Sequence, residues 1–390
     1  MKYRLGVIFG GKSVEHEISV ITAVQVMANL NTDKYDIIPI YITKDLQWYT
    51  GAMLKDIQSY KDFDLIKRYA AKVNMVNKDG RYILQKTRFF KLEIAEIDLV
   101  LPIVHGCNME DGTIQGFLNI IGVPYVGSDI YTSAIGQDKV FMKQIFKANN
   151  IPITEYKHFM AKDYYQEKEK VIKKLISMDF PLIVKPATLG SSIGITKADT
   201  KEELVAAIDE AVKYDSKIVV ERVVDNLVEV NCSVLGGDER IQTSEIEEII
   251  KTDKILSYKD KYQGSAVTSG KGLVASRRII PARLNKDLLK EVSNLAIKVF
   301  ECFNCLGVVR IDFLVDKKSK KVYVNEINTI PGSLSYYLWE PKNINYTELL
   351  DEIIRITIRN YKRKVNMISS FDTNILSSLS KNGFTGSKSK

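Results

Sequence analysis

Residues 308–328 hold acid, amide and guanidinium side chains among apolar residues. Two β-branched segments flank a polar turn, which predicts a β-hairpin with Arg310 and Asp312 on one strand and Glu326 and Asn328 on the other. Side chains alternate along a strand, so Glu326 and Asn328 share a face, which Asp312 joins if the strands face each other. Three oxygen ligands would then converge, as a magnesium site requires, and Arg310 could hold a phosphoryl group.

The other interpretation of this segment is a surface hairpin whose charges are solvated. The apolar residues Ile311, Phe313, Val322 and Val324 argue against it, because they predict a buried environment. Buried carboxylates require a cation or another partner.

A second candidate site follows the predicted strand 180–186, which ends in Lys185 and Pro186. The next residues, 187–195, form a Gly/Ser loop framed by strands. Such a loop can fold over phosphates and donate backbone and hydroxyl hydrogen bonds. The polar, aromatic loop 257–264 offers further mobile donors.

The beginning of the chain predicts a strand at 3–9, a Gly-Gly turn and a helix with apolar residues three or four apart. Glu15 lies in the first turn of that helix. Either it stabilises the positive helix end, or it points into a cleft at the carboxyl edge of the sheet, where open α/β sheets bind ligands.

The same segment matches a P-loop pattern, G-x-x-x-x-G-K-[ST], from Gly6 to Ser13. A P-loop needs its first glycine after the strand, whereas here residues 7–9 are the strand itself. We therefore expect no phosphate loop here and no essential role for Lys12.

The remaining elements follow from periodicity and turn residues. Strands are expected at 35–42, 98–104, 122–126, 218–221 and 229–235, a hairpin turn at 78–80, and helices at 113–121, 139–147, 171–176, 201–213, 288–303 and 345–361. Residues 366–390 are rich in Ser, Lys and Asn and predict a loosely ordered basic tail.

Composition indicates an ordinary globular chain. It has 390 residues, 45% hydrophobic and 27% charged, which predicts two to three domains. No apolar run is long enough to span a bilayer and no signal peptide is visible, so we expect a cytoplasmic protein. Cys302 and Cys305 have CxxC spacing without a second pair, which favours two small residues at a helix end.

The net charge of +8 does not indicate nucleic-acid binding. Residues 361–390 hold six lysines and arginines against one aspartate, so the tail accounts for five of the eight charges. The remainder is close to neutral and shows no basic face.

Seven motifs make the chain similar to the D-alanine–D-alanine ligases of the ATP-grasp superfamily over roughly residues 3–360. They are GGKSVEHEIS (10–19), HGCNMEDGTIQG (105–116), GQDKVFMK (136–143), VKPATLGSSIGI (184–195), KDKY (259–262), VRIDF (309–313) and NEINTIPG (325–332). The resemblance implies an α/β (α+β) ATP-grasp fold with three domains, the first an open parallel-sheet domain. The expected domains are 1–128, 129–225 and 226–365, followed by the tail 366–390.

The resemblance also implies roles for individual residues. ATP would be held by Lys139 and Lys185 on the phosphates, Glu221 at the adenine edge, Glu229 on the ribose, Ser192 in the Gly/Ser loop and Lys261 on the transferred phosphate. Two Mg²⁺ ions, with Mn²⁺ as an alternative, would be bound by Asp312, Glu326 and Asn328.

The substrate and catalytic residues follow in the same way. Glu15 would anchor the ammonium of the first substrate, and His105 would lie by the carboxylate of that substrate. Glu15 would also join Ser191 and Tyr262 in ordering a lid at 258–270. Arg310 and the Gly332 N–H would stabilise the tetrahedral intermediate, and Tyr337 and Leu338 would lie by the second substrate.

Two residues depart from the family pattern. Met109 replaces the second glycine of H-G-x-x-G-E-D-G, and Tyr337 stands where a serine usually holds the second substrate's carboxylate. The departure at Tyr337 concerns the second substrate and not the catalysis. In the family, a tyrosine at the position of Tyr262 accompanies amide rather than ester formation, so we expect a dipeptide product.

We therefore expect an ATP-dependent ligase that joins two D-alanines through an acyl phosphate for peptidoglycan synthesis, as a cytoplasmic homodimer. The alternative within the fold is a D-alanyl–D-X ligase, for example with D-serine, or another carboxylate–amine ligase. Two other classes of protein are alternatives. A P-loop nucleotide switch would require Lys12. A catalytically inactive protein that senses an amino acid would not need Asp312, Glu326, Asn328 and Arg310, which are all present.

Overall fold

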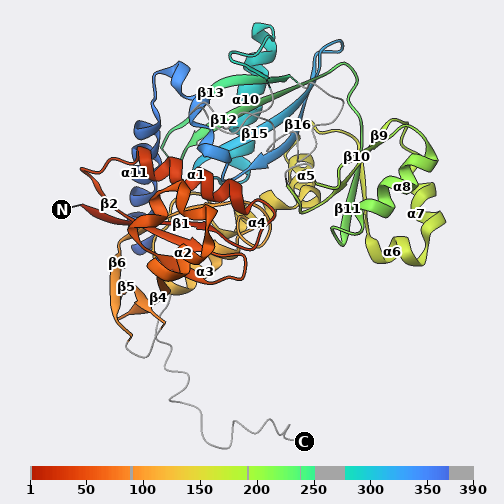
Figure 1. The fold of residues 1–390 in the computed structure, drawn as a ribbon. Coiled ribbons are helices and arrows are strands. Elements are labelled where there is room, and N and C mark those ends of the chain that lie inside the picture. Colours follow the sequence, from red (N-terminus) through yellow and green to blue (C-terminus); the bar gives the residue numbers. More distant parts are fainter. Residues whose placement is uncertain (1, 88–90, 191–192, 238, 251–276, 369–390) are drawn as a thin grey trace, which may run out of the picture.

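The computed structural model describes residues 2–87, 91–190, 193–237, 239–250 and 277–368, which form three β-sheets with flanking helices (Figure 1). Each sheet is built from one continuous stretch of sequence. No element in these ranges is a helix long and apolar enough to cross a membrane.

The N-terminal sheet has seven strands in the order β6-β5-β4-β3-β2-β1-β7. The strands are β1 (Tyr3–Gly10), β2 (Tyr35–Ile42), β3 (Trp48–Thr50), β4 (Ala71–Lys78), β5 (Arg81–Lys86), β6 (Glu93–Ile97) and β7 (Leu99–Val104). Only β2-β1-β7 is parallel, and the other pairs are antiparallel. The expected parallel sheet is thus one end of a mixed sheet, with β7 as its edge strand.

Helices α1 (His16–Asn29), α2 (Phe63–Tyr69) and α3 (Thr113–Ile121) accompany this sheet, with 3-10 turns at Ala52–Lys55 and Ile57–Lys61. The strand expected at 122–126 is wrong. The segment makes only a single parallel bridge, Val100 to Tyr125. Gly122 has a left-handed φ of 88° and ends α3, and Pro124 has no N–H to donate, so regular pairing cannot extend.

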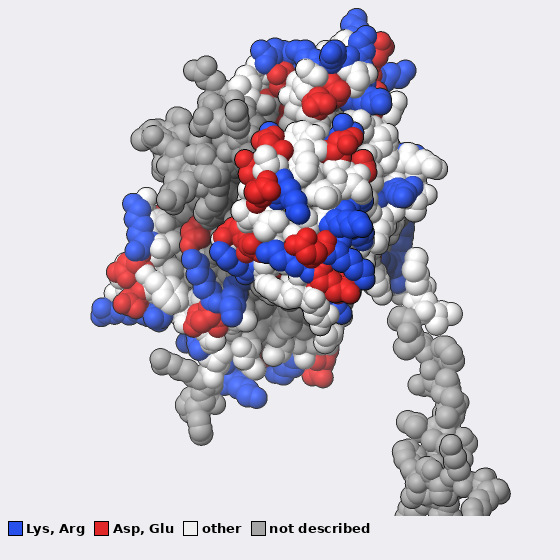
Figure 2. Space-filling model, turned by 90° about the vertical axis from the view of Figure 1, so that its right-hand side faces the viewer, with Lys and Arg blue, Asp and Glu red and all other residues white. Residues whose placement is uncertain are grey.

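The central sheet has the order β10-β9-β11-β8 and is antiparallel. Its strands are β8 (Tyr156–Met160), β9 (Leu182–Pro186), β10 (Thr196–Ala198) and β11 (Lys217–Arg222), with helices α6 (Ala161–Gln166), α7 (Lys168–Leu175) and α8 (Lys201–Ala211) packed against it. Acidic and basic side chains are interspersed on the face shown in Figure 2. The helices of this sheet also carry surface ion pairs, Lys168–Asp209 and Lys213–Glu210.

The C-terminal sheet is antiparallel, in the order β14-β13-β12-β15-β16. Its strands are β12 (Leu227–Gly236), β13 (Ile241–Ile250), β14 (Arg277–Ile279), β15 (Gly307–Asp316) and β16 (Lys321–Asn328), covered by α10 (Lys286–Cys302). The expected hairpin is confirmed as β15–β16. Asp312 pairs with Glu326 and Arg310 with Asn328 across it.

Helices α4 (Ile130–Gln137) and α5 (Lys139–Ala148) connect the N-terminal and central sheets. After β16 come 3-10 turns at Gly332–Leu338 and Glu340–Lys342 and the long helix α11 (Tyr346–Val365), which Asn345 and Glu348 open with a capping box. The apolar face of α11 joins the core of the N-terminal sheet through Leu349, Leu350 and Ile353.

Candidate active site

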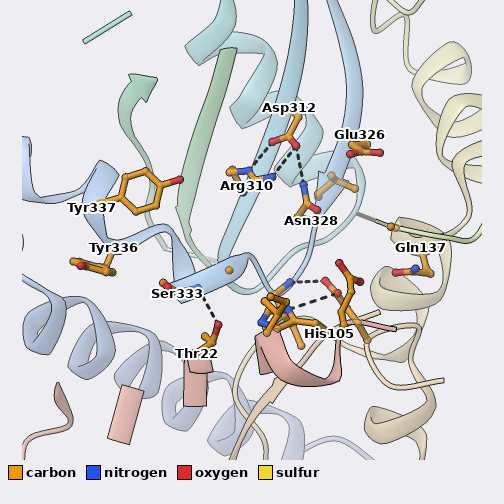
Figure 3. Close-up of a pocket in the computed structure, with 18 of the residues that line it drawn as sticks. Thr22, His105, Gln137, Arg310, Asp312, Glu326, Asn328, Ser333, Tyr336 and Tyr337 are labelled. Atoms are coloured by element: carbon orange, nitrogen blue, oxygen red, sulfur yellow. Dashed lines mark hydrogen bonds and ion pairs between the residues drawn. The ribbon is translucent and has the colours of Figure 1, made fainter. Parts of the chain in front are cut away.

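A cavity of about 480 Å³ lies between the sheets and collects side chains from each part of the chain. Glu15 and Thr22 come from the α1 region, His105 and Glu110 from the end of β7, and Lys139 from α5, while Gly190 belongs to the Gly/Ser loop; the hairpin β15–β16 and the turn after it complete the wall. Figure 3 shows Arg310 near the middle, with Tyr337 and Glu326 toward opposite ends.

The hairpin places its polar side chains on the cavity wall. Arg310 donates to both oxygens of Asp312, at 2.6 and 2.8 Å, and the Asn328 amide donates to Asp312 at 3.1 Å (Figure 3). Burial raises the pKa of Asp312 against the opposing effect of the Arg310 guanidinium. The interpretation as a solvated surface hairpin is therefore wrong.

The donor chemistry of this wall fits a divalent cation. Asp312 and Glu326 are opposed carboxylates, and the repulsion from Glu326 adds to the raised pKa of Asp312. A cation would offset that repulsion, and Asn328 adds an amide oxygen. Among the described residues no group of three or more Asp, Glu, His or Cys forms a metal cluster, because this set is two acids and an amide.

Lys139 links the hairpin to the Gly/Ser loop. Its Nζ lies 3.5 Å from Glu326 Oε2 and donates to the Leu189 carbonyl at 2.8 Å. The ammonium therefore stands beside the carboxylate pair and next to the loop expected to cover phosphates. Its position fits the expected phosphate contact.

Lys185 and Glu221 belong to one buried cluster of charges. The sequence indicated each residue separately but not their contact. Glu221 lies 3.1 Å from both Lys185 and Lys143 and accepts a hydrogen bond from Thr154 at 2.7 Å. Burial favours the neutral acid, but the two lysines hold the pKa of Glu221 well below its usual range. The sequence did hold one signal for Lys143. It lies one helical turn after Lys139, which places the two lysines on the same face of the helix.

The Glu221 carboxylate is thus occupied by two lysines, with its side chain 1% exposed, rather than presented at the cavity surface. The expected contact with adenine remains a prediction. Lys185 also reaches Asn325 at 3.4 Å, beside Glu326. Glu229 lies on β12, paired across the sheet with Leu314, and is not on the cavity wall.

Glu15 faces the cavity and does not cap α1 with its side chain. A Cβ atom on Gly190 would lie 3.1 Å from Glu15 Oε2, and one on Gly106 would lie 2.7 Å from the same oxygen. Two glycines therefore let the backbone approach this carboxylate closely. Glu15 therefore stands at the start of α1 and also faces the cavity, and its substrate role stays a prediction.

His105 and Glu110 form the floor beside Glu15. Burial lowers the pKa of His105 to about 4, so the ring is neutral, and its Nε2 has no hydrogen-bond partner among the described residues. Burial raises the pKa of Glu110 to about 8, with Glu15 adding to the shift, and Glu110 accepts from the Ile330 N–H at 3.0 Å. Glu110 belongs to the motif at 105–116, but the sequence alone assigns it no role.

Met109 fills the space above the Gly10–Gly11 turn. It is 3% exposed, and a Cβ on Gly11 would lie 2.2 Å from its sulfur. The departure from the family motif is therefore explained by packing. The Met109 side chain fills the space beside Gly11, where no other residue type would fit.

The turn after β16 carries Gly332 on the cavity wall and three successive residues with left-handed φ of 49–51°, Ser333, Leu334 and Ser335. Left-handed non-glycine residues are costly. Thr22 accepts from the Ser333 N–H at 3.4 Å (Figure 3), and the Ser333 hydroxyl donates to Gln25 at 2.7 Å. These contacts from α1 hold the turn.

Beyond this turn, Tyr337 lines the cavity and its hydroxyl donates to Glu247 at 2.9 Å, while Leu338 is fully buried. Arg278 lies over the Tyr337 ring. Neither Glu247 nor Arg278 had a recognisable signal in the sequence. Four expected site residues, Ser191, Ser192, Lys261 and Tyr262, and the lid 258–270 lie outside the described residues.

The P-loop interpretation does not fit the structure. Gly6 lies inside β1, paired with Ile38 and Val100, so no loop follows it. A Cβ on Gly6 would lie 2.9 Å from Ile40 Cδ1, which explains the glycine by packing. All four cysteines are free thiols.

Comparison with known proteins gives two family models, "D-ala D-ala ligase N-terminus" over residues 4–128 and "D-ala D-ala ligase C-terminus" over 145–355. A D-alanine–D-alanine ligase of Thermosipho melanesiensis is 38% identical over 95% of this chain and 98% of its own length. One from Thermosipho africanus is 41% identical, over 95% and 97%.

Two solved structures are also similar. The D-alanine–D-alanine ligase of Coxiella burnetii has a TM-score of 0.80 and 28% identity, covering 93% of this chain and 96% of that one. The VanG D-Ala:D-Ser ligase of Enterococcus faecalis has a TM-score of 0.77 and 29% identity, covering 92% and 100%.

Proposed function

The chain belongs to the D-alanine–D-alanine ligase family, and from that premise we propose how its cavity performs the reaction. It has the ATP-grasp fold and is an ATP-dependent ligase that joins D-alanine to D-alanine for cell-wall synthesis. The observation that carries the mechanism is the Arg310–Asp312 pair facing Glu326 and Lys139 in one cavity.

The first step makes a poor electrophile reactive. The carboxylate of the first D-alanine attacks the terminal phosphorus of ATP, which gives an acyl phosphate and ADP. Glu15 binds the ammonium of this substrate, and neutral His105 lies by its carboxylate. Lys139 and Lys185 hold phosphates, helped by Ser192 and Lys261.

The second step forms the amide. The amine of the second D-alanine attacks the acyl carbon, and the tetrahedral intermediate places negative charge on oxygen before phosphate leaves. Arg310 and the Gly332 N–H stabilise that oxyanion. Tyr262 and Ser191 order the loop that keeps water from the acyl phosphate.

Asp312, Glu326 and Asn328 would hold the magnesium ions, with Mn²⁺ as an alternative. When bound, magnesium offsets the negative charge of the phosphates during transfer. Support for this assignment comes from the opposed carboxylates and the raised pKa of Asp312.

A second candidate function is a D-alanyl–D-X ligase. Tyr337 stands on the cavity wall where the family usually places serine, and one structural neighbour is titled a D-Ala:D-Ser ligase. Both functions require the same donor and nucleotide chemistry, so only the acceptor distinguishes them.

The enzyme works as a homodimer in the cytoplasm, as the family resemblance implies. The dimer is tested by light scattering coupled to size-exclusion chromatography. The reaction is tested by ADP release with a panel of D-amino acids and mass spectrometry of the products. D-alanyl-D-alanine as the main product supports the first function, and no ADP release with any D-amino acid would overturn both.

A further inference from the structure

The Tyr337 hydroxyl donates its hydrogen bond to a buried carboxylate. It donates to Glu247 Oε1 at 2.9 Å, and the Asn231 amide donates to the same oxygen at 2.9 Å. Glu247 is 1% exposed. Because a phenol has one proton to donate, the hydroxyl cannot also donate to a substrate while this bond stands.

Arg278, from the short edge strand β14, lies beside this pair. Its guanidinium carbon is 4.1 Å from the centre of the Tyr337 ring, and its Nε is 3.6 Å from Glu247 Oε2. The side chain lines the cavity and is 27% exposed. The ring and the carboxylate together fix where the guanidinium lies.

This places a cation at the end of the cavity away from the phosphate-binding residues. Figure 3 shows Tyr336 and Tyr337 on the side opposite Glu326 and Gln137, with Arg310 between them. If the reaction centre lies at Arg310 and ATP lies toward Glu326, the second amino acid occupies the tyrosine end. A planar guanidinium is suited to bind a carboxylate with two hydrogen bonds.

We propose that Arg278, and not the Tyr337 hydroxyl, binds the carboxylate of the second D-amino acid, while Tyr337 and Glu247 position Arg278. This inference rests on the proposed ligase function and deepens it, because it assigns the acceptor class: amino acids with a free α-carboxylate. Arg278 thus takes over a task that the family usually gives to a serine.

The test compares two acceptors that differ only in that carboxylate, D-alanine and D-alaninamide, with D-alanine as donor. The amide cannot serve as donor, since it has no carboxylate to phosphorylate. Arg278→Met is expected to raise the acceptor KM for D-alanine about tenfold to a hundredfold, the scale of a lost charge-assisted hydrogen bond. The KM for D-alaninamide should change less than about threefold.

Two further variants separate recognition from structure. Tyr337→Phe removes the hydroxyl but keeps the ring beside Arg278, so it should raise the KM for D-alanine less than Arg278→Met does and leave the KM for D-alaninamide unchanged. Arg283→Met is the matched control, since Arg283 pairs with Glu248 outside the cavity, and it should change neither KM.

The inference is overturned if Arg278→Met weakens both acceptors equally, if it changes neither KM, or if Tyr337→Phe raises the KM for D-alanine as much as Arg278→Met does. Failure of the proposed function would look different, because the parent enzyme would then make no product from D-alanine.

Discussion

The Arg310 guanidinium and the Asp312 carboxylate form a two-point ion pair inside the cavity, with N–O distances of 2.6 and 2.8 Å. The residues are two apart on β15 and share a face. Asp312 is therefore already shared between Arg310 and Asn328. We therefore expect Glu326, beside Lys139, to be the acid that acts most directly on a bound cation and on phosphates.

Glu326→Gln should lower turnover at least about a hundredfold while the protein stays folded. The substitution removes a carboxylate charge that we expect to bind the magnesium ions beside the transferred phosphoryl group. Phosphate release at saturating magnesium measures the loss, and circular dichroism checks the fold. Glu291→Gln, on the exposed face of α10, is the control and should match the parent. Near-normal turnover of Glu326→Gln would remove the metal assignment.

Lys12→Ala should bind ATP within a few-fold of the parent. Lys12 is exposed, and the glycine that a P-loop needs before it lies inside β1. Lys185→Ala, measured beside it by isothermal titration, should lose about tenfold or more, since Lys185 is held next to the hairpin. Equal losses in the two variants would restore the P-loop interpretation.

Tyr337→Ser should change the acceptor preference more than the donor KM or ATP use. A serine side chain leaves the tyrosine ring's volume empty and removes the platform under Arg278. Mass spectrometry of products from D-alanine mixed with D-serine or D-lactate measures the change. The parent should form dipeptides; mainly D-alanyl-D-lactate from the parent, or an unchanged profile in the variant, would contradict this.

Glu221→Gln should destabilise the protein by about 3–5 kcal/mol, because it leaves Lys143 and Lys185 buried near each other without a counter-charge. Thermal unfolding measures the effect. Glu202→Gln, exposed on α8, should change the midpoint little. A similar small change in Glu221→Gln would mean that water or relaxation compensates the two lysines.

The pH dependence of stability should report Glu110. Its folded-state pKa of about 8 lies above its ordinary value, so folding favours the neutral acid. That contribution is complete at pH below the ordinary pKa and is lost as the pH rises through about 8. Between about pH 6 and about pH 8.5, the unfolding midpoint of the parent should fall more than that of Glu110→Gln, which keeps the side chain neutral. Parallel curves would show that Glu110 is ionised in the folded protein.

Local patterns predicted much of the fold. The strand 35–42 and the helix 113–121 have the predicted bounds, because a buried apolar run and a clear helical period are encoded within the element itself. The β15–β16 hairpin was predictable for the same reason, and with it the meeting of Asp312 and Glu326.

The rest of the site depends on contacts between distant segments. Glu221 meets Lys143 and Lys185 from two other elements, and Tyr337 meets Glu247 from β13, ninety residues earlier. No local period encodes such pairs. Arg278 illustrates the limit well, since it belongs to a three-residue strand whose function follows only from what lies across the cavity.

The helix α11 has a mechanical consequence. Its apolar face shares one hydrophobic core with β1 and β7, and Leu235 and Val308 of the C-terminal sheet join the same core. The central sheet has a separate core made only of residues between 159 and 220. The beginning and end of the chain therefore share a core that the central sheet does not join. We expect the central sheet to move relative to the other two more easily than those two move relative to each other. Such a movement would carry Lys185 and Glu221 with the central sheet and leave Arg310, Asp312 and Glu15 in place. Nucleotide would then enter and leave without disturbing the place where we expect the two amino acids to meet.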